Sequence, residues 1–304
     1  MNGLKHGLSS EFVPEWCAVA ALVLLDVLWA ARIPVTFTIT RDDFLVLGLG
    51  LGACWGLRAM RLRKGGLMAE YFALTLTATT AICVLSYLCL ASSGPLVDAR
   101  LMAMDRALGF DWLAGYQFLS AHPGLKSVLG FAYGSLVYQG LYFCVLLALM
   151  DRKQRMRDMF WLFGLCALFA CLGTLLFPAL GPSKFFNIET HNGFVPVMEH
   201  ILSGRDLTFA LSGMTGVVSF PSFHTAMALA YVWAFRGTGP AGWAMAGVNL
   251  VMLLAVPFFG GHYLMDMIAG AATMLLSLAM VKYAPGLWAM RGTGRRQTVA
   301  AANA

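Results

Sequence analysis

The stretch SFPSFHTAMALAYVWAF, from Ser219 to Phe235, places a proline, two serines and a histidine directly before an apolar run. Proline fits the first turn of a helix, and a serine side chain caps the free N–H groups there. Pro221 and Ser222 therefore predict the start of a helix. His224 would lie at its N-terminus, with the apolar run behind it.

The composition is that of an integral membrane protein. Of the 304 residues, 59% are apolar and 12% are charged, whereas soluble domains have about 45–50% and about 25%. The seven cysteines lie in apolar segments without a CxxC pair, so we interpret them as small hydrophobic residues. The net charge of +6 is not arranged as a basic stripe with aromatics, which argues against nucleic acid as a partner.

Apolar segments long enough to cross a bilayer, about 20 residues each, occur eight times. The sequence predicts an all-α bundle of about eight transmembrane helices. Their expected ranges are 14–33, 42–60, 69–91, 127–150, 158–178, 217–236, 241–259 and 262–283. We divide the chain into two N-terminal helices with a basic loop (1–68), a six-helix core (69–283) and a polar cytoplasmic tail (284–304).

The lysines and arginines predict the orientation of this bundle. With both termini in the cytoplasm, 14 of the 21 fall on inner segments, as the positive-inside rule requires. The two long connections, about 92–126 and 179–216, then lie outside. His224 and His262 both fall at outer helix ends, so any chemistry would face the side away from the cytoplasm.

A second motif, GGHYLMDMIAG, begins at Gly260 and again places a histidine before an apolar run. His262 and Asp266 are four residues apart and share a helix face. An aspartate there can hold one imidazole nitrogen and leave the other free as a nucleophile or base. Protonated His224 could donate a proton to a leaving alkoxide.

Phosphate is the ligand that these helix ends favour, because free N–H groups and the helix dipole attract anions. Ser219 and Ser222 could contact the phosphate or cap the helix. The competing chemical interpretation is a zinc site with His191 or His200 as third ligand. Neither has metal-type spacing to a partner, so no metal and no other cofactor is expected.

The motifs PSFHTA and GGHYLMDMIAG resemble two signature motifs of the type 2 phosphatidic acid phosphatase superfamily, approximately P-S-x-H and S-R-x5-H-x3-D. The forms SFPSFH and HYxxD look closest to the branch of inositol phosphorylceramide synthases, and sphingomyelin synthases share the HYxxD pattern. The segment MDRALGFDW, from Met104 to Trp112, also resembles one that precedes the core helices of this branch. The resemblance covers about residues 100–283.

The resemblance implies a six-helix phosphatase-like core and a role for each motif residue. His262 would attack phosphorus, and Asp266 would orient and charge-stabilise it. His224 would protonate the leaving oxygen and then act as base on the incoming water or alcohol. A phosphohistidine would connect the two steps.

The basic part of the superfamily pattern is incomplete here. The first motif, K-x6-R-P, has no counterpart around Lys184, and Val256 stands where the arginine of the third motif would fall. Phosphoryl transfer requires positive charge near the phosphate oxygens. Lys184 is the expected replacement, with Arg205 and Arg106 as weaker candidates. Their alternative interpretations are an interfacial lysine and solvated loop charges.

These observations predict a membrane enzyme that transfers a phosphoryl headgroup from a phospholipid to a lipid alcohol such as ceramide or diacylglycerol. Hydrolysis of a lipid phosphate or polyprenyl diphosphate is the alternative. A transporter is a distant alternative, since Asp26 is the only ionisable residue expected deep in the bilayer. A structural or assembly protein would have no need of paired histidines. The expected location is a bacterial inner membrane, with the site facing the periplasm.

Overall fold

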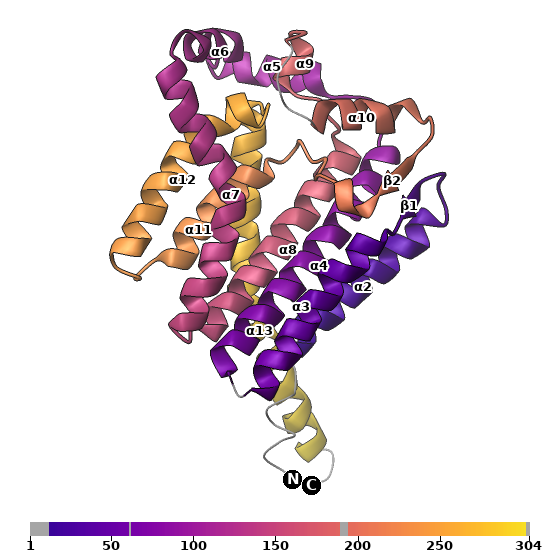
Figure 1. Cartoon of the computed structure of the whole chain (residues 1–304), viewed down its shortest axis with the longest axis vertical. Coiled ribbons are helices and arrows are strands. Elements are labelled where there is room, and N and C mark those ends of the chain that lie inside the picture. Colours follow the sequence, from indigo (N-terminus) through magenta and orange to yellow (C-terminus); the bar gives the residue numbers. More distant parts are fainter. Residues whose placement is uncertain (1–11, 61, 189–193, 302–304) are drawn as a thin grey trace.

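The computed structural model describes residues 12–60, 62–188 and 194–301, and this part of the chain is almost entirely helical (Figure 1). In chain order, its elements are α2 (Val13–Ala30), β1 (Thr36–Thr38), α3 (Arg41–Ala59), α4 (Arg63–Ala91), α5 (Asp98–Ala107), α6 (Trp112–Ala121), α7 (Pro123–Leu149), α8 (Lys153–Leu176), α9 (Pro182–Phe185), α10 (Phe194–Ser203), β2 (Thr208–Ala210), η1 (Leu211–Gly213), α11 (Phe223–Phe235), α12 (Pro240–Phe259) and α13 (Leu264–Ala301).

Six helices of the described chain are long and apolar enough to cross a membrane. They are α2, α4, α7, α8, α12 and the Leu264–Tyr283 part of α13. This confirms the prediction of a helical membrane protein. Helices also occupy the two other predicted spans, as α3 and α11, but neither is among the six. The 19-residue helix α3 carries four charged residues, Arg41, Asp42, Asp43 and Arg58, and α11 has only 13 residues.

The predicted span 217–236 is too long at its N-terminal end. α11 has 13 residues and begins only at Phe223. Pro221 cannot donate a backbone hydrogen bond, and the side chain of Ser222 accepts from the Thr225 N–H as an N-cap. At 1.5 Å per residue α11 is about 20 Å long, well below the bilayer core of about 30 Å. Its first residue therefore lies inside the bundle.

α11 occupies the centre of the bundle, where it packs against α7, α8, α12 and α13 (Figure 1). Small residues on it allow the close contact that membrane helices use in place of hydrophobic collapse. Those that are buried are Thr225, Ala226, Ala228, Ala230 and Ala234. The helix that carries His224 is thereby held from four sides.

The two ends of the bundle differ. The start of α2 and the C-terminal end of α13 lie at one end, and α5, α6, α9 and α10 gather at the other (Figure 1). These four helices fill the two predicted long connections, and we call them the outer cap. A short parallel pair, β1 with β2, places Thr36 opposite Thr208 and joins the N-terminal helices to the chain that follows α10.

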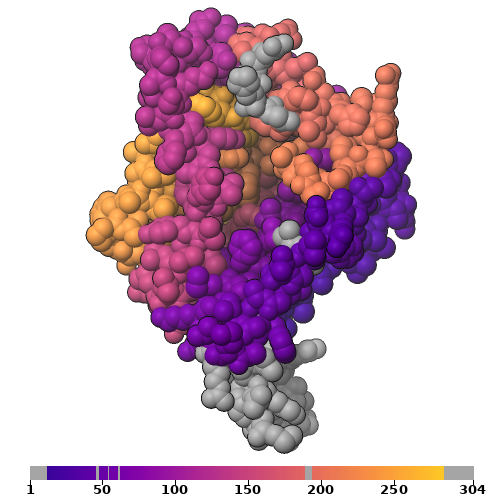
Figure 2. Space-filling model, in the orientation of Figure 1, coloured from indigo at the N-terminus to yellow at the C-terminus, as the bar shows by residue number. Residues whose placement is uncertain are grey.

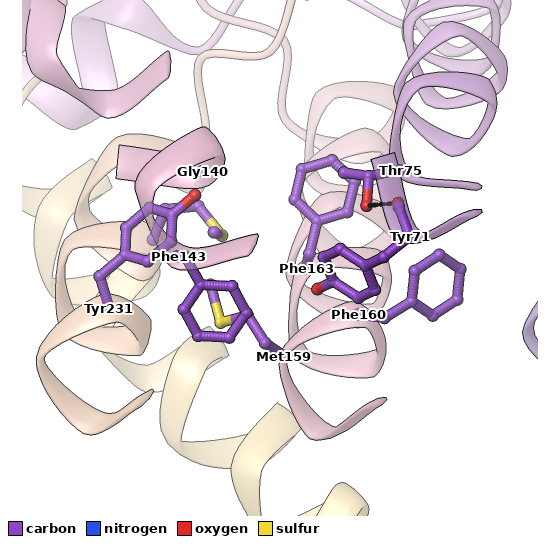
Figure 3. Close-up of a pocket in the computed structure, with 9 residues that line it drawn as sticks. Tyr71, Thr75, Gly140, Phe143, Met159, Phe160, Phe163 and Tyr231 are labelled. Carbon is purple, nitrogen blue, oxygen red and sulfur yellow. Dashed lines mark hydrogen bonds between the residues drawn. The ribbon is translucent and has the colours of Figure 1, made fainter. Parts of the chain in front are cut away.

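A hollow separates α7 from the α3–α4 side of the molecule (Figure 2). At its floor lies a cavity of about 30 Å³ between α4, α7, α8 and α11. Figure 3 shows Gly140 and Tyr231 on one side of this cavity, with Tyr71, Thr75 and Phe163 on the other. The volume suits one or two water molecules, and neither motif histidine lines this cavity.

An ion pair with a buried carboxylate and a partly exposed arginine connects the N-terminal helix α2 to the core helix α8. Glu15 is 1% exposed and accepts from Arg157 Nε at 2.9 Å, from Arg157 Nη2 at 3.1 Å and from Trp161 Nε1 at 3.2 Å. Removing one partner of such a pair leaves a buried charge, which is more costly than removing both.

We expect Arg157→Ala to lower the free energy of unfolding by about 3 kcal/mol because it strands the Glu15 carboxylate. The double variant Glu15→Gln/Arg157→Met should be less destabilised than this single variant. Thermal unfolding in detergent measures both. A double variant at least as unstable as Arg157→Ala would show that the charge on Glu15 is not the cause.

Candidate active site

The turn between α12 and α13 presents His262. Pro257 lies near the end of α12, and Gly261 adopts a positive φ of 61°, so the chain leaves the helix and reverses before Leu264. His262 Nδ1 lies 3.2 Å from Asp266 Oδ2, and the two side chains are only 4% and 0% exposed. The predicted pair is therefore formed and buried.

Asp266 connects several parts of this site. Its Oδ2 also accepts from the Tyr263 N–H at 2.9 Å, and its backbone carbonyl accepts from the Ser222 N–H at 2.9 Å. The first bond holds the carboxylate against the turn that presents His262. The second bond joins the start of α13 to the start of α11, which carries the other histidine.

An acceptor at Nδ1 determines the tautomer of His262. The proton of the neutral imidazole is assigned to Nδ1, facing Asp266, which leaves the lone pair on Nε2. Burial lowers the pKa of His262 from its ordinary value to about 4, and a hydrogen bond with the Ser219 backbone opposes this shift in part. The imidazole is therefore neutral at pH 7, as a nucleophile must be.

His224 lies in the first turn of α11, two residues after the capping serine. Its ring stacks on Tyr133 of α7, with ring centroids 4.3 Å apart and planes inclined by 12°. The two imidazoles, His224 and His262, are close enough to interact electrostatically. The structure thus brings together the three residues predicted from the two motifs.

Two glycines allow the segments of the site to meet. A Cβ at Gly270 of α13 would overlap the Ser222 carbonyl oxygen, and one at Gly181 would overlap the Gly261 carbonyl oxygen. Gly181 also has a φ of 93°, which L side chains rarely adopt. Both positions need glycine because backbone packs directly against backbone.

The candidate phosphate-binding residues are placed unevenly. Ser219 and Ser222 are buried beside the histidines, and the hydroxyl of Ser222 caps α11. Lys184 lies on α9, three residues after Gly181, and its Nζ pairs with Glu199 Oε1 at 2.6 Å while its side chain is 44% exposed. The segment that carries Lys184 therefore adjoins the α12–α13 turn, but Glu199 partly neutralises the charge of Lys184.

Arg205 lies in an exposed turn between α10 and β2, where its backbone N–H donates to Ser203 Oγ at 3.3 Å. In Figure 1 this connection lies at the right-hand edge, beyond α10, whereas the α12–α13 turn lies near the middle of the same end. Arg106 is an exposed residue of α5. The structure does not bring either arginine into the group formed by His224, His262 and Asp266.

Metal ligands were the alternative use for the histidines. Within the described ranges, no three His, Cys, Asp or Glu side chains form a group that could hold a metal ion. His200 Nε2 lies 3.2 Å from the Asp206 carbonyl, and its ring packs against Phe209. His191 lies outside the described residues.

Residues of the MDRALGFDW segment contact the site in a way that the motifs did not indicate. Asp105 is buried and accepts from the N–H groups of Leu264 and Met265 at 2.8 and 3.0 Å. Burial raises the pKa of Asp105, and these two donors partly oppose that rise. Trp112 Nε1 donates to the Pro257 carbonyl at 2.8 Å. The sequence signal for these contacts was an acid, Asp105, followed by an amphipathic aromatic residue, Trp112, ahead of a membrane-spanning helix.

We expect Gly270→Ala to destabilise the protein by about 1–3 kcal/mol, because the added methyl forces α13 away from the start of α11. Gly247→Ala is the matched control, since a Cβ at that α12 position meets nothing within 4 Å. Thermal unfolding of both variants in detergent measures the difference. Equal stability of the two variants would contradict the close approach at Gly270.

The comparisons with known proteins agree with this arrangement. The family model described as the PAP2 superfamily matches residues 99–280, more than half of the chain and all of the site described above. No curated protein and no solved structure matched the chain. The chain therefore belongs to the PAP2 superfamily, and it is a phosphatase or phosphotransferase that acts on lipid phosphates.

Proposed function

We propose that this protein is a membrane lipid phosphotransferase of the inositol phosphorylceramide synthase type, acting through a phosphohistidine. The observation that carries the proposal is the buried pair of His262 Nδ1 with Asp266 Oδ2, and the proposal assigns Nε2 of the neutral imidazole as the attacking atom. A membrane phospholipid is the proposed donor, and a lipid alcohol such as ceramide or diacylglycerol is the proposed acceptor.

In the first half-reaction, Nε2 of His262 attacks phosphorus and the bond from phosphorus to the lipid oxygen breaks. His224 donates its proton to that oxygen, so the lipid alcohol leaves neutral. Asp266 stabilises the positive charge that develops on the imidazole of His262. Ser219, Ser222 and Lys184 are the proposed contacts of the phosphate oxygens, where negative charge has to be balanced.

In the second half-reaction, neutral His224 takes the proton from the hydroxyl of the acceptor. The acceptor oxygen attacks phosphorus, the phosphorus–nitrogen bond breaks, and both histidines return to their starting states. Burial of His262, which is 3% exposed, favours a lipid hydroxyl over bulk water at this step. Resolution by water, which gives a lipid phosphate hydrolase, is the second candidate and shares the same first half.

We propose that the site faces the side away from the cytoplasm, in a bacterial inner membrane. The motif histidines adjoin the outer cap. The short basic connections lie at the other end of the bundle, with Arg152 after α7 and Arg236 after α11. Cytoplasmic connections carry such an excess of lysine and arginine. The headgroup of the substrate would then lie on the periplasmic side of the membrane.

The first test supplies the purified protein with phosphatidylinositol, phosphatidylethanolamine, phosphatidylcholine, phosphatidic acid and a polyprenyl diphosphate, each with and without ceramide or diacylglycerol. Mass spectrometry identifies the products. We expect a new headgroup-bearing lipid only when an acceptor is present. His262→Ala should reduce product formation by about 10⁴-fold or more.

His122→Ala is the matched histidine control, since His122 is exposed and its ring contacts the Phe118 carbonyl. It should behave as wild type. Phosphate or phosphorylated headgroup released without an acceptor would establish the hydrolase instead. Identical products from wild type and His262→Ala would contradict the two-histidine mechanism.

The pH dependence should report the low pKa of His262. Protonation of His262 removes its lone pair, so the acid limb of kcat/KM should lie near pH 4, while loss of the proton that His224 donates sets a separate alkaline limb. A solvent-exposed histidine would already lose activity near pH 6.5. A phosphodiester donor is suitable because its phosphate does not titrate in this range.

The control for this measurement is enzyme held at pH 4 and assayed again at pH 7, which separates protonation from unfolding. An acid limb near pH 6.5 that persists after this control would show that His262 is not kept neutral by burial.

A further inference from the structure

α5 crosses the outer end of the bundle and carries two acids, Asp98 and Asp105. They are seven residues apart, so they lie two turns from each other on one helix face. Neither acid lies on α11 or α13, the helices of the two histidine motifs. Both carboxylates nevertheless accept hydrogen bonds from the segments that form the active site.

Asp105 caps the helix of the nucleophile from outside. Its Oδ2 accepts from the Leu264 N–H at 2.8 Å, and its Oδ1 accepts from the Met265 N–H at 3.0 Å. These are the first two N–H groups of α13, which have no partner inside their own helix. The negative charge also lies at the positive end of the α13 dipole. Asp105 is 0% exposed, so water does not substitute for it.

Asp98 joins two other segments. Its Oδ1 accepts from the Gly181 N–H at 2.8 Å and from the Tyr263 hydroxyl at 2.9 Å, and both of its oxygens lie 3.1 Å from the Leu180 N–H. Tyr263 directly follows the nucleophile in the chain. Leu180 and Gly181 directly precede α9, which carries Lys184. One carboxylate therefore connects the turn of the nucleophile to the segment of the candidate phosphate-binding lysine.

We propose that Asp98 and Asp105 are positioning residues, and that α5 sets the position of His262 relative to the α8–α9 connection. The inference rests on the proposed roles of His262 and Lys184. Asp105 fixes the position of the N-terminus of α13, and therefore the position of Asp266. Asp98 determines how far the lysine segment lies from the phosphorus that His262 attacks. A displacement of about 1 Å between reacting groups can cost about 10²-fold in rate.

The test replaces each acid by its amide, which keeps the shape but puts an NH₂ group where an oxygen accepted. Asp105→Asn should lower kcat by about 10²-fold with little change in the KM of the donor lipid, because only the nucleophile is displaced. Asp98→Asn should lower kcat and also raise the donor KM, because the lysine segment moves as well. Asp105→Glu should recover part of the kcat that Asp105→Asn loses.

Asp111→Asn is the matched control. Asp111 also caps a helix, accepting from the Ala114 N–H at 3.0 Å at the start of α6, but it has no part in the proposed positioning. Its kcat should equal that of wild type. Equal kcat values for Asp111→Asn and Asp105→Asn, with His262→Ala inactive, would overturn the positioning role and leave the proposed function intact.

An active His262→Ala would instead overturn the proposed function itself. Should Asp105→Asn fail to fold, Tyr263→Phe decides the question, since it removes only the hydroxyl that binds Asp98. A several-fold lower kcat in Tyr263→Phe, measured as slower phosphohistidine formation in a single turnover, supports the inference. An unchanged rate overturns it.

Discussion

The site depends on the hydrogen bonds that the carboxylate and the backbone carbonyl of Asp266 accept. One oxygen holds His262 and the N–H of Tyr263, and the carbonyl of the same residue holds the N–H of Ser222. A buried acid with no partner would be costly in this location. These bonds satisfy Oδ2 and the backbone carbonyl and fix the two motif segments against each other, while Oδ1 has no hydrogen-bond partner within the described part of the chain.

The need to satisfy buried polar groups also explains the architecture around the site. Helix ends leave N–H groups without partners, and a site inside a membrane protein cannot rely on water to satisfy them. Here Ser222 accepts from an N–H group at the start of α11, and Asp105 of the outer cap accepts from one at the start of α13. Gly270 and Gly181 let the segments approach closely enough for these bonds to form. The position of His262 is therefore a consequence of how the helix ends are satisfied.

The motif residues could be predicted from the sequence because their chemistry is local. His262 and Asp266 share a helix face by spacing alone, and Pro221 with Ser222 indicates a helix start. Six of the eight predicted spans meet the length and hydropathy of membrane helices for the same reason. The predicted span 217–236 began before α11, because it included the apolar residues that precede Pro221, whereas Pro221 and Ser222 indicated the helix start that the structure has.

The sequence by itself determined that the chain is a helical membrane protein and that two histidines head two of its helices, since composition and periodicity are properties of short segments. Only the tertiary structure decided that Lys184 pairs with Glu199, that Arg205 lies away from the histidines, and that acids of α5 hold the turn that carries His262. These relations join residues far apart in the chain. They depend on how the helices pack, which no local pattern encodes.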